Sequence, residues 1–162
     1  MIITLFLVAL AFVTTTLFGY VAHWALHQKF FGRFHQSHMT HHLKLYPVSD
    51  FTSDKYRFAG KDSTIWFFLI AGAPLLILPV VLLLLGKIGL ITTILVVAMA
   101  GGIGLLNNWF HDSFHVKDHF MNYFGWYRKL VELHFEHHVN MQKNFGIFFF
   151  AWDKLFKSYS EK

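Results

Sequence analysis

The 162-residue chain contains no cysteine, and only 14% of its residues are charged. The absence of cysteine excludes disulfides, cysteine-ligated iron–sulfur clusters and thiolate-ligated haem. The chain therefore has no such centre with which to carry electrons. What it has in abundance is apolar residues, at 55% of the sequence. Its length predicts a single domain over residues 1–162.

Three long apolar runs lack Asp, Glu, Lys, Arg and His, and they cover about residues 1–22, 64–85 and 88–110. Each has roughly the 20 residues that a membrane-spanning helix needs. The first run lacks the basic segment and the small-residue cleavage site of a signal peptide, so we predict a permanent helix. Gly86 and Lys87 predict a tight hairpin between the other two.

The basic residues indicate how these spans are oriented. Thirteen of the 14 Lys and Arg residues lie in residues 23–63 and 111–162, and only Lys87 lies in the hairpin. Positive charge marks the cytoplasmic side of a multi-pass protein, in a bacterial inner membrane or the endoplasmic reticulum. The net charge of +5 reflects this bias and does not indicate nucleic-acid binding.

Ten of the 12 histidines fall into two copies of one pattern, H-x3-H followed by H-x2-H-H. Residues three or four apart share a helix face, so each box is expected to point all or most of its imidazoles in one direction. Imidazole is a common ligand of Fe, Zn, Cu and Ni, and four ligands fill a structural zinc site. We therefore predict at least two metal ions, bound by His23, His27, His38, His41, His42, His111, His115, His134, His137 and His138.

All the histidines lie outside the apolar runs and on the same predicted side of the membrane. Each half of the chain reads as a helix that ends in H-x3-H, then a cytoplasmic segment with H-x2-H-H. The boxes occupy residues 23–42 and 111–138, and this repeat is loose. The predicted fold is an all-α membrane bundle of three transmembrane helices, with cytoplasmic helices that carry a histidine-rich di-metal site. Residues 46–60 predict a loop, and residues 144–152 an apolar segment that lies on the membrane surface.

Several other polar residues lie near the boxes. A metal-bound histidine usually gives its second nitrogen to a carboxylate or carbonyl, and this role is open to Asp112, Glu136, Asp153 and Asn108. The alternative is that Asp112 and Glu136 face solvent and that Asn108 caps the membrane exit. For His35 and His119 a role other than ligand is favoured, with His119 a candidate outer-shell partner.

The ordered motifs HWALH, HMTHH, HDSFH and HFEHH, with the tail NFGIFFFAWDKLF, resemble the fatty acid hydroxylase/sterol desaturase superfamily of membrane di-iron enzymes. The chain is short, like the carotenoid hydroxylases of that superfamily. The resemblance implies two iron ions held by the histidines, O2 as oxidant, and a fatty acyl, sterol or carotenoid substrate. It also implies an external electron donor, a ferredoxin or cytochrome b5 with its reductase. Zinc can replace iron in a purified sample, because imidazole sites accept both.

The resemblance has two departures: three spans are predicted where the family often has four, and Lys157 and Ser158 replace a frequent Gly-Thr. The sequence leaves hydroxylation and desaturation both open. Three rival functions are a haem-binding electron carrier, a metal-binding membrane protein without chemistry, and a zinc hydrolase that uses Glu136. The first predicts histidines inside the spans, the second predicts ionisable residues there, and the third usually needs a carboxylate base.

Overall fold

The computed structural model describes residues 1–58 and 65–161, and three long helices dominate them. These are α1 (Ile2–Leu26), α3 (Ile65–Leu84) and α4 (Leu90–Phe114), and each is long and apolar enough to cross a membrane. These helices confirm the three predicted spans. The first residue of the second predicted span, Thr64, lies outside the described residues. Within the described residues the only β-structure is one isolated bridge, between Ser53 and Val116.

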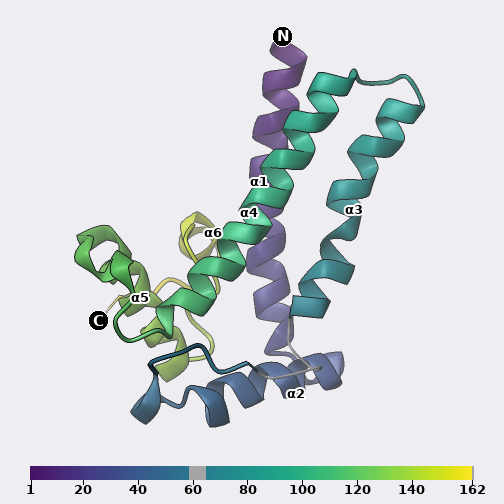
Figure 1. The fold of residues 1–162 in the computed structure, drawn as a ribbon. Coiled ribbons are helices and arrows are strands. Elements are labelled where there is room, and N and C mark those ends of the chain that lie inside the picture. The colour runs from purple at the N-terminus through teal and green to yellow at the C-terminus, as the bar shows by residue number, and fades with distance from the viewer. Residues whose placement is uncertain (59–64, 162) are drawn as a thin grey trace.

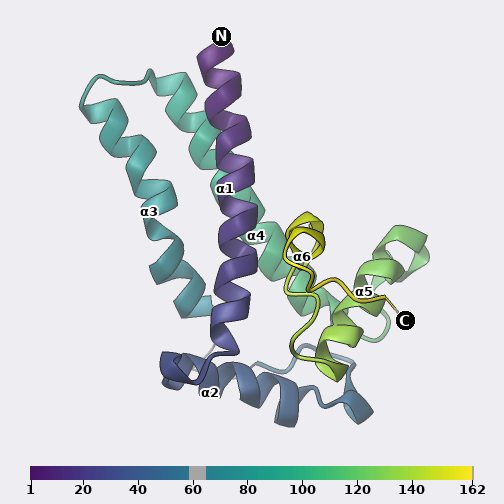
Figure 2. The same ribbon diagram turned by 180° about the vertical axis from the view of Figure 1, so that it is seen from behind.

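The three long helices stand side by side, and α4 packs against both α1 and α3 (Figures 1 and 2). The N-terminus and the α3–α4 connection lie at one end of the bundle. The connection is the expected tight turn: Gly86 has a φ of 66°, and its amide and that of Lys87 bond back to the last carbonyls of α3. Glycine is favoured there because other residues adopt positive φ at a cost.

The shorter helices gather at the opposite end of the bundle. After α1 come η1 (Lys29–Phe31), α2 (Arg33–Thr40), the π-helical turn η2 (His41–Leu45) and η3 (Val48–Asp50). After α4 come η5 (Phe120–Tyr123) and α5 (Gly125–Val139). In Figure 1, α2 lies across the lower ends of the long helices, with α5 beside it. Residues 46–58 are mostly irregular, as predicted, and residues 59–60 of that expected loop lie outside the described residues.

Two of the long helices run further than their apolar sequences, as the repeat predicts. Helix α1 includes His23 in its last turn and is capped by His27. Helix α4 includes His111 in its last turn and is capped by His115. A buried cluster of Phe110, Phe114, Tyr127 and Ile147 fixes the end of α4 against α5 and the segment that follows it.

The C-terminal segment packs against α1 and contains the short helix α6 (Ala151–Leu155). Its place on the membrane surface stays a prediction. Trp152 donates a hydrogen bond to Thr16, and Phe149 packs edge-on against Phe12. Phe12 lies 11 residues before His23, or about 16 Å along a helix. The aromatic side chains of this segment thus pack deep against α1.

Candidate metal site

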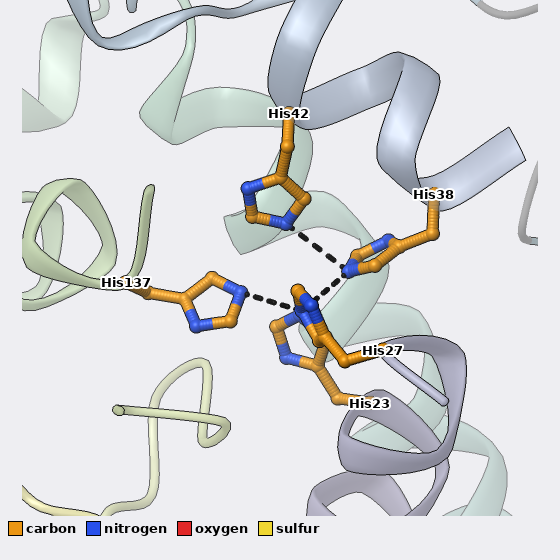
Figure 3. A group of neighbouring side chains, drawn as sticks. All are labelled: His23, His27, His38, His42 and His137. Atoms are coloured by element: carbon orange, nitrogen blue, oxygen red, sulfur yellow. Dashed lines mark hydrogen bonds between the residues drawn. The ribbon is translucent and has the colours of Figure 1, made fainter. Parts of the chain in front are cut away.

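Nine of the ten predicted ligands converge in two adjacent groups. The first group contains five histidines and the second group four, and within each group the candidate ligand atoms lie within 4.8 Å of one another. The first group is His23, His27, His38, His42 and His137, and the second is His41, His115, His134 and His138. Figure 3 shows the first group, in which side chains from α1, α2, η2 and α5 point toward one centre.

Each H-x2-H-H box points most of its imidazoles, two of three, into one group, as expected, and the remaining one into the other group. His38 and His42 belong to the first group, but His41 between them belongs to the second. In the same way, His134 and His138 belong to the second group and His137 to the first. Successive residues on a helix differ by about 100° in direction, so the middle histidine of each box (His41 or His137) points away from the outer two. Each half of the chain therefore contributes one histidine, His41 or His137, to the group formed mainly by the other half. This exchange packs the two halves against each other.

His111 lies beside the second group without belonging to it. Its ring centroid is 4.7 Å from that of His41 and 4.9 Å from that of His134. Its Nδ1 lies 3.5 Å from a carboxylate oxygen of Asp112, which also accepts a hydrogen bond from Asn108. His111, which the sequence predicts as a ligand, thus lies next to the second group and not in it, with Asp112 and Asn108 beside it.

The histidines are held in their neutral form by burial. All nine have exposed fractions of 9% or less, and those of His115, His134 and His137 are 0%. Burial lowers the pKa of His27 to about 4 and that of His138 to about 3. Burial, followed by the mutual repulsion of neighbouring imidazolium ions, also lowers the pKa of His38, His41, His42, His115, His134 and His137. Neutral imidazole is the form that binds a metal.

Backbone carbonyls orient two histidines in each group. In the first group, the Nδ1 of His137 donates to the Lys143 carbonyl at 2.6 Å, and that of His23 donates to the Phe145 carbonyl at 2.7 Å. In the second group, His115 and His138 donate to Phe51 and Tyr46, each at 2.9 Å. A neutral imidazole that donates from Nδ1 presents an unprotonated Nε2. These four histidines therefore aim a free lone pair into their groups.

The atoms that face inward match what a metal ion requires. The Nε2 atoms of His23, His41 and His138 are buried and have no hydrogen-bond partner within the described residues. Other Nε2 atoms approach each other closely, at 2.9 Å between His27 and His38 and at 3.1 Å between His115 and His134. Nitrogens bound about 2.1 Å from one ion lie about 3–3.4 Å apart. A cation at each centre would satisfy these lone pairs, and the residues fit two ions.

The two other predicted outer residues, Asp153 and Glu136, are buried and bond to groups other than the histidines. Asp153 is fully buried and accepts hydrogen bonds from the amides of Phe145 and Gly146, so it reaches His23 through one peptide unit and not directly. Glu136 is buried and accepts a hydrogen bond from Ser160.

The two histidines outside the boxes have other roles. His119 caps η5 by accepting from the amide of Met121, and its ring stacks on Tyr127. His35 donates to the Leu26 carbonyl and so ties α2 to the end of α1. Neither belongs to a histidine group among the described residues.

Tyr46 is a residue of the site that the sequence did not reveal. Its side chain is fully buried, with its ring stacked on that of His115 at 4.0 Å and its hydroxyl bonded to the backbone of Arg57. Its carbonyl is the acceptor for His138. Any residue can supply a carbonyl, so its side chain gave no sign of this role. The only signal was its position directly after the first H-x2-H-H box.

A search of curated proteins and a search of solved structures gave no match. The sequence model of the family described as fatty acid hydroxylase matches residues 8–158, which include all four histidine boxes and the C-terminal segment. The chain, with its apolar helices and histidine groups, therefore belongs to the fatty acid hydroxylase family.

Proposed function

We propose that this protein is a membrane oxygenase that uses two iron ions and O2 to hydroxylate or desaturate an unactivated C–H bond of a lipid. The observation that carries the proposal is the pair of buried histidine groups at one end of three apolar helices. Family membership supports a hydroxylase or desaturase. Reduced iron, when bound, would supply the reaction of O2 with the lipid C–H bond, which no side chain can perform.

The residues of the chain would hold the metal ions, orient the histidine rings and exclude water from the site. The first group would hold one ion and the second group the other, with His111 available to the second. The carbonyls of Lys143, Phe145, Tyr46 and Phe51 fix the rings, so that little reorganisation accompanies the reaction. Burial keeps bulk water from the ions and from reactive species.

We propose that the lipid approaches from the membrane side of the first group. A cavity there, between α1, α4 and the C-terminal segment, has a volume of about 10 Å³ and would have to widen to admit a lipid; it is lined by Thr16, Gly19, Tyr20, Asn107 and residues 146–149. Gly19 and Tyr20 are one turn from His23 on the membrane side of the first group. A lipid-soluble substrate, whether fatty acyl, sterol or carotenoid, would enter from the bilayer along this face. We propose that the histidine end faces the cytoplasm, where an external ferredoxin or cytochrome b5 would deliver electrons.

Lipid mass spectrometry of a host that expresses the chain under 18O2 tests the proposal. Hydroxylation would add one 18O atom to a lipid, and desaturation would remove two hydrogens. The matched control is His138→Ala, which removes one histidine of the second group and lies outside the three apolar helices. Identical lipids in cells with the wild type and with His138→Ala would contradict the proposal, and oxygen derived from water would favour hydrolytic chemistry.

A further inference from the structure

Each histidine group has its own set of backbone acceptors. The first group uses Lys143 and Phe145, which follow α5, and the second uses Tyr46 and Phe51, which follow η2. The two sets are far apart in the sequence. A change that moves one set should therefore alter one group and leave the other in place.

The acceptors of the first group are clamped by two fully buried polar side chains, Asn144 and Asp153. Asn144 has a φ of 54°, and its side-chain amide donates to the carbonyls of Leu133 at 3.0 Å and Ser160 at 2.8 Å. The Ser160 amide donates back to its side-chain oxygen at 2.9 Å. This clamp ties residues 143–145 to α5 on one side and to the C-terminal residues on the other.

Asp153 completes the clamp from α6. Its carboxylate accepts hydrogen bonds from the amides of Phe145 at 2.7 Å and Gly146 at 2.8 Å, and from the hydroxyl of Ser158 at 2.7 Å. A buried carboxylate is costly unless it is fully hydrogen-bonded, and these three donors meet that need. The Gly146 N–H that Asp153 holds and the Phe145 carbonyl that accepts from His23 belong to the same peptide unit.

We propose that Asp153 is a positioning residue for the first group alone: it holds Phe145 so that His23 presents its Nε2 to a metal ion. This inference rests on the proposed function, in which each group holds one ion. Outer partners of metal-bound histidines typically change metal affinity by about 10–100-fold. In Asp153→Asn, an amide NH2 group would face a backbone N–H, so the peptide that orients His23 would shift.

The experiment measures metal affinity in two backgrounds that isolate the groups. His115→Ala disables the second group and leaves the first, whereas His27→Ala disables the first and leaves the second. Zinc is titrated into metal-free protein in detergent against a competing chelator, with and without Asp153→Asn. We expect Asp153→Asn to weaken zinc binding by about 10–100-fold in the His115→Ala background and by less than about twofold in the His27→Ala background.

A matched control separates positioning from general loosening of α6. Trp152→Phe removes the neighbouring hydrogen bond from α6 to Thr16 but leaves the three donors to Asp153 untouched, so both affinities should stay at the wild-type value. Ser158→Ala, a milder change that removes one donor to Asp153, covers the case in which Asp153→Asn does not fold, and it should weaken the first group alone. Equal weakening in both backgrounds, or none in either, would overturn the inference. A wild-type chain that binds fewer than two zinc ions would overturn the proposed function itself and the inference with it.

Discussion

The imidazole rings of His42 and His138 lie with their centroids 4.1 Å apart, at an interplanar angle of 35°. His42 comes from the first half of the chain and belongs to the first group, and His138 comes from the second half and belongs to the second group. The two groups are thus in direct contact through these two imidazole rings. Ions held by the two groups would therefore be neighbours, as the proposed function requires.

The exchange of histidines between the halves makes a specific prediction. His41→Ala changes a residue of the first H-x2-H-H box, yet it should remove a ligand from the second group, because His41 lies with His115, His134 and His138. We expect lipid oxidation to fall by more than about 100-fold, since a ligand matters more than an outer partner. Product analysis and a metal count on the purified variant check this.

His119→Asn is the control for that loss. Asparagine is a preferred capping residue and should preserve the cap of η5 that His119 now makes. The variant should keep wild-type metal content and activity. If His119→Asn lost activity to the same degree as His41→Ala, the assignment of the groups would be wrong.

The stability of the metal-free protein should depend on pH. The pKa is about 4 for His27 and about 3 for His138, whereas an unfolded histidine titrates near 6.5. Below pH 6.5 the unfolded chain binds protons that the folded chain excludes, so the free energy of unfolding falls as pH falls toward 4, by about 1.4 kcal/mol per pH unit for each such histidine. Thermal unfolding in detergent should show a melting temperature lower by at least about 5 °C at pH 5 than at pH 7.5. An unchanged or higher value at pH 5 would show that the histidines are not buried in neutral form.

Gly146 should tolerate no side chain. A Cβ atom there would lie 2.6 Å from the Phe149 carbonyl oxygen and 2.7 Å from an Asp153 carboxylate oxygen, both of which are fixed. Gly146→Ala should therefore destabilise the protein by about 1–3 kcal/mol, as overpacking does. Gly102→Ala is the matched control in α4, because a Cβ at Gly102 meets no atom within 4 Å. Equal melting temperatures for the two variants would contradict the tight fit of the C-terminal segment.

Tyr46 should stabilise the second group through its ring. Tyr46→Ala removes a fully buried ring that stacks on His115, and we expect a loss of about 3–5 kcal/mol together with weaker binding of one ion. Tyr46→Phe keeps the ring and removes only the hydroxyl that accepts from the Arg57 amide, at a cost of about 1 kcal/mol. Zinc titration and thermal unfolding of both variants check this order, and equal effects would assign the role to the hydroxyl.

Much of this architecture is predictable from local sequence patterns. The lengths of the apolar runs identify α1, α3 and α4, and the H-x3-H spacing places His23 and His111 on the last turns of two of them. The convergence of the boxes follows from having three spans, which bring both halves to one end of the bundle. These are properties of single helices and their order, which a sequence encodes directly.

Other features depend on packing between distant residues and leave little trace in the sequence. The split of each H-x2-H-H box follows from helix rotation, but which group His41 joins depends on where α2 docks. The carbonyls of Phe145 and Phe51 are acceptors by position alone. The apolar character of Phe149 suits several positions near a membrane. Its packing partner, Phe12 of α1, could not be read from the sequence.

The iron content of the protein shows whether the two histidine groups hold two metal ions. Metal-free protein in detergent is loaded anaerobically with 57Fe(II), excess iron is removed, and bound iron is counted per chain by mass spectrometry and examined by Mössbauer spectroscopy. The two histidine groups predict two ferrous ions per chain, in nitrogen-rich environments, both oxidised on exposure to O2. Saturation at one ion per chain, or two ions that stay ferrous in O2 with a lipid substrate present, would contradict the account.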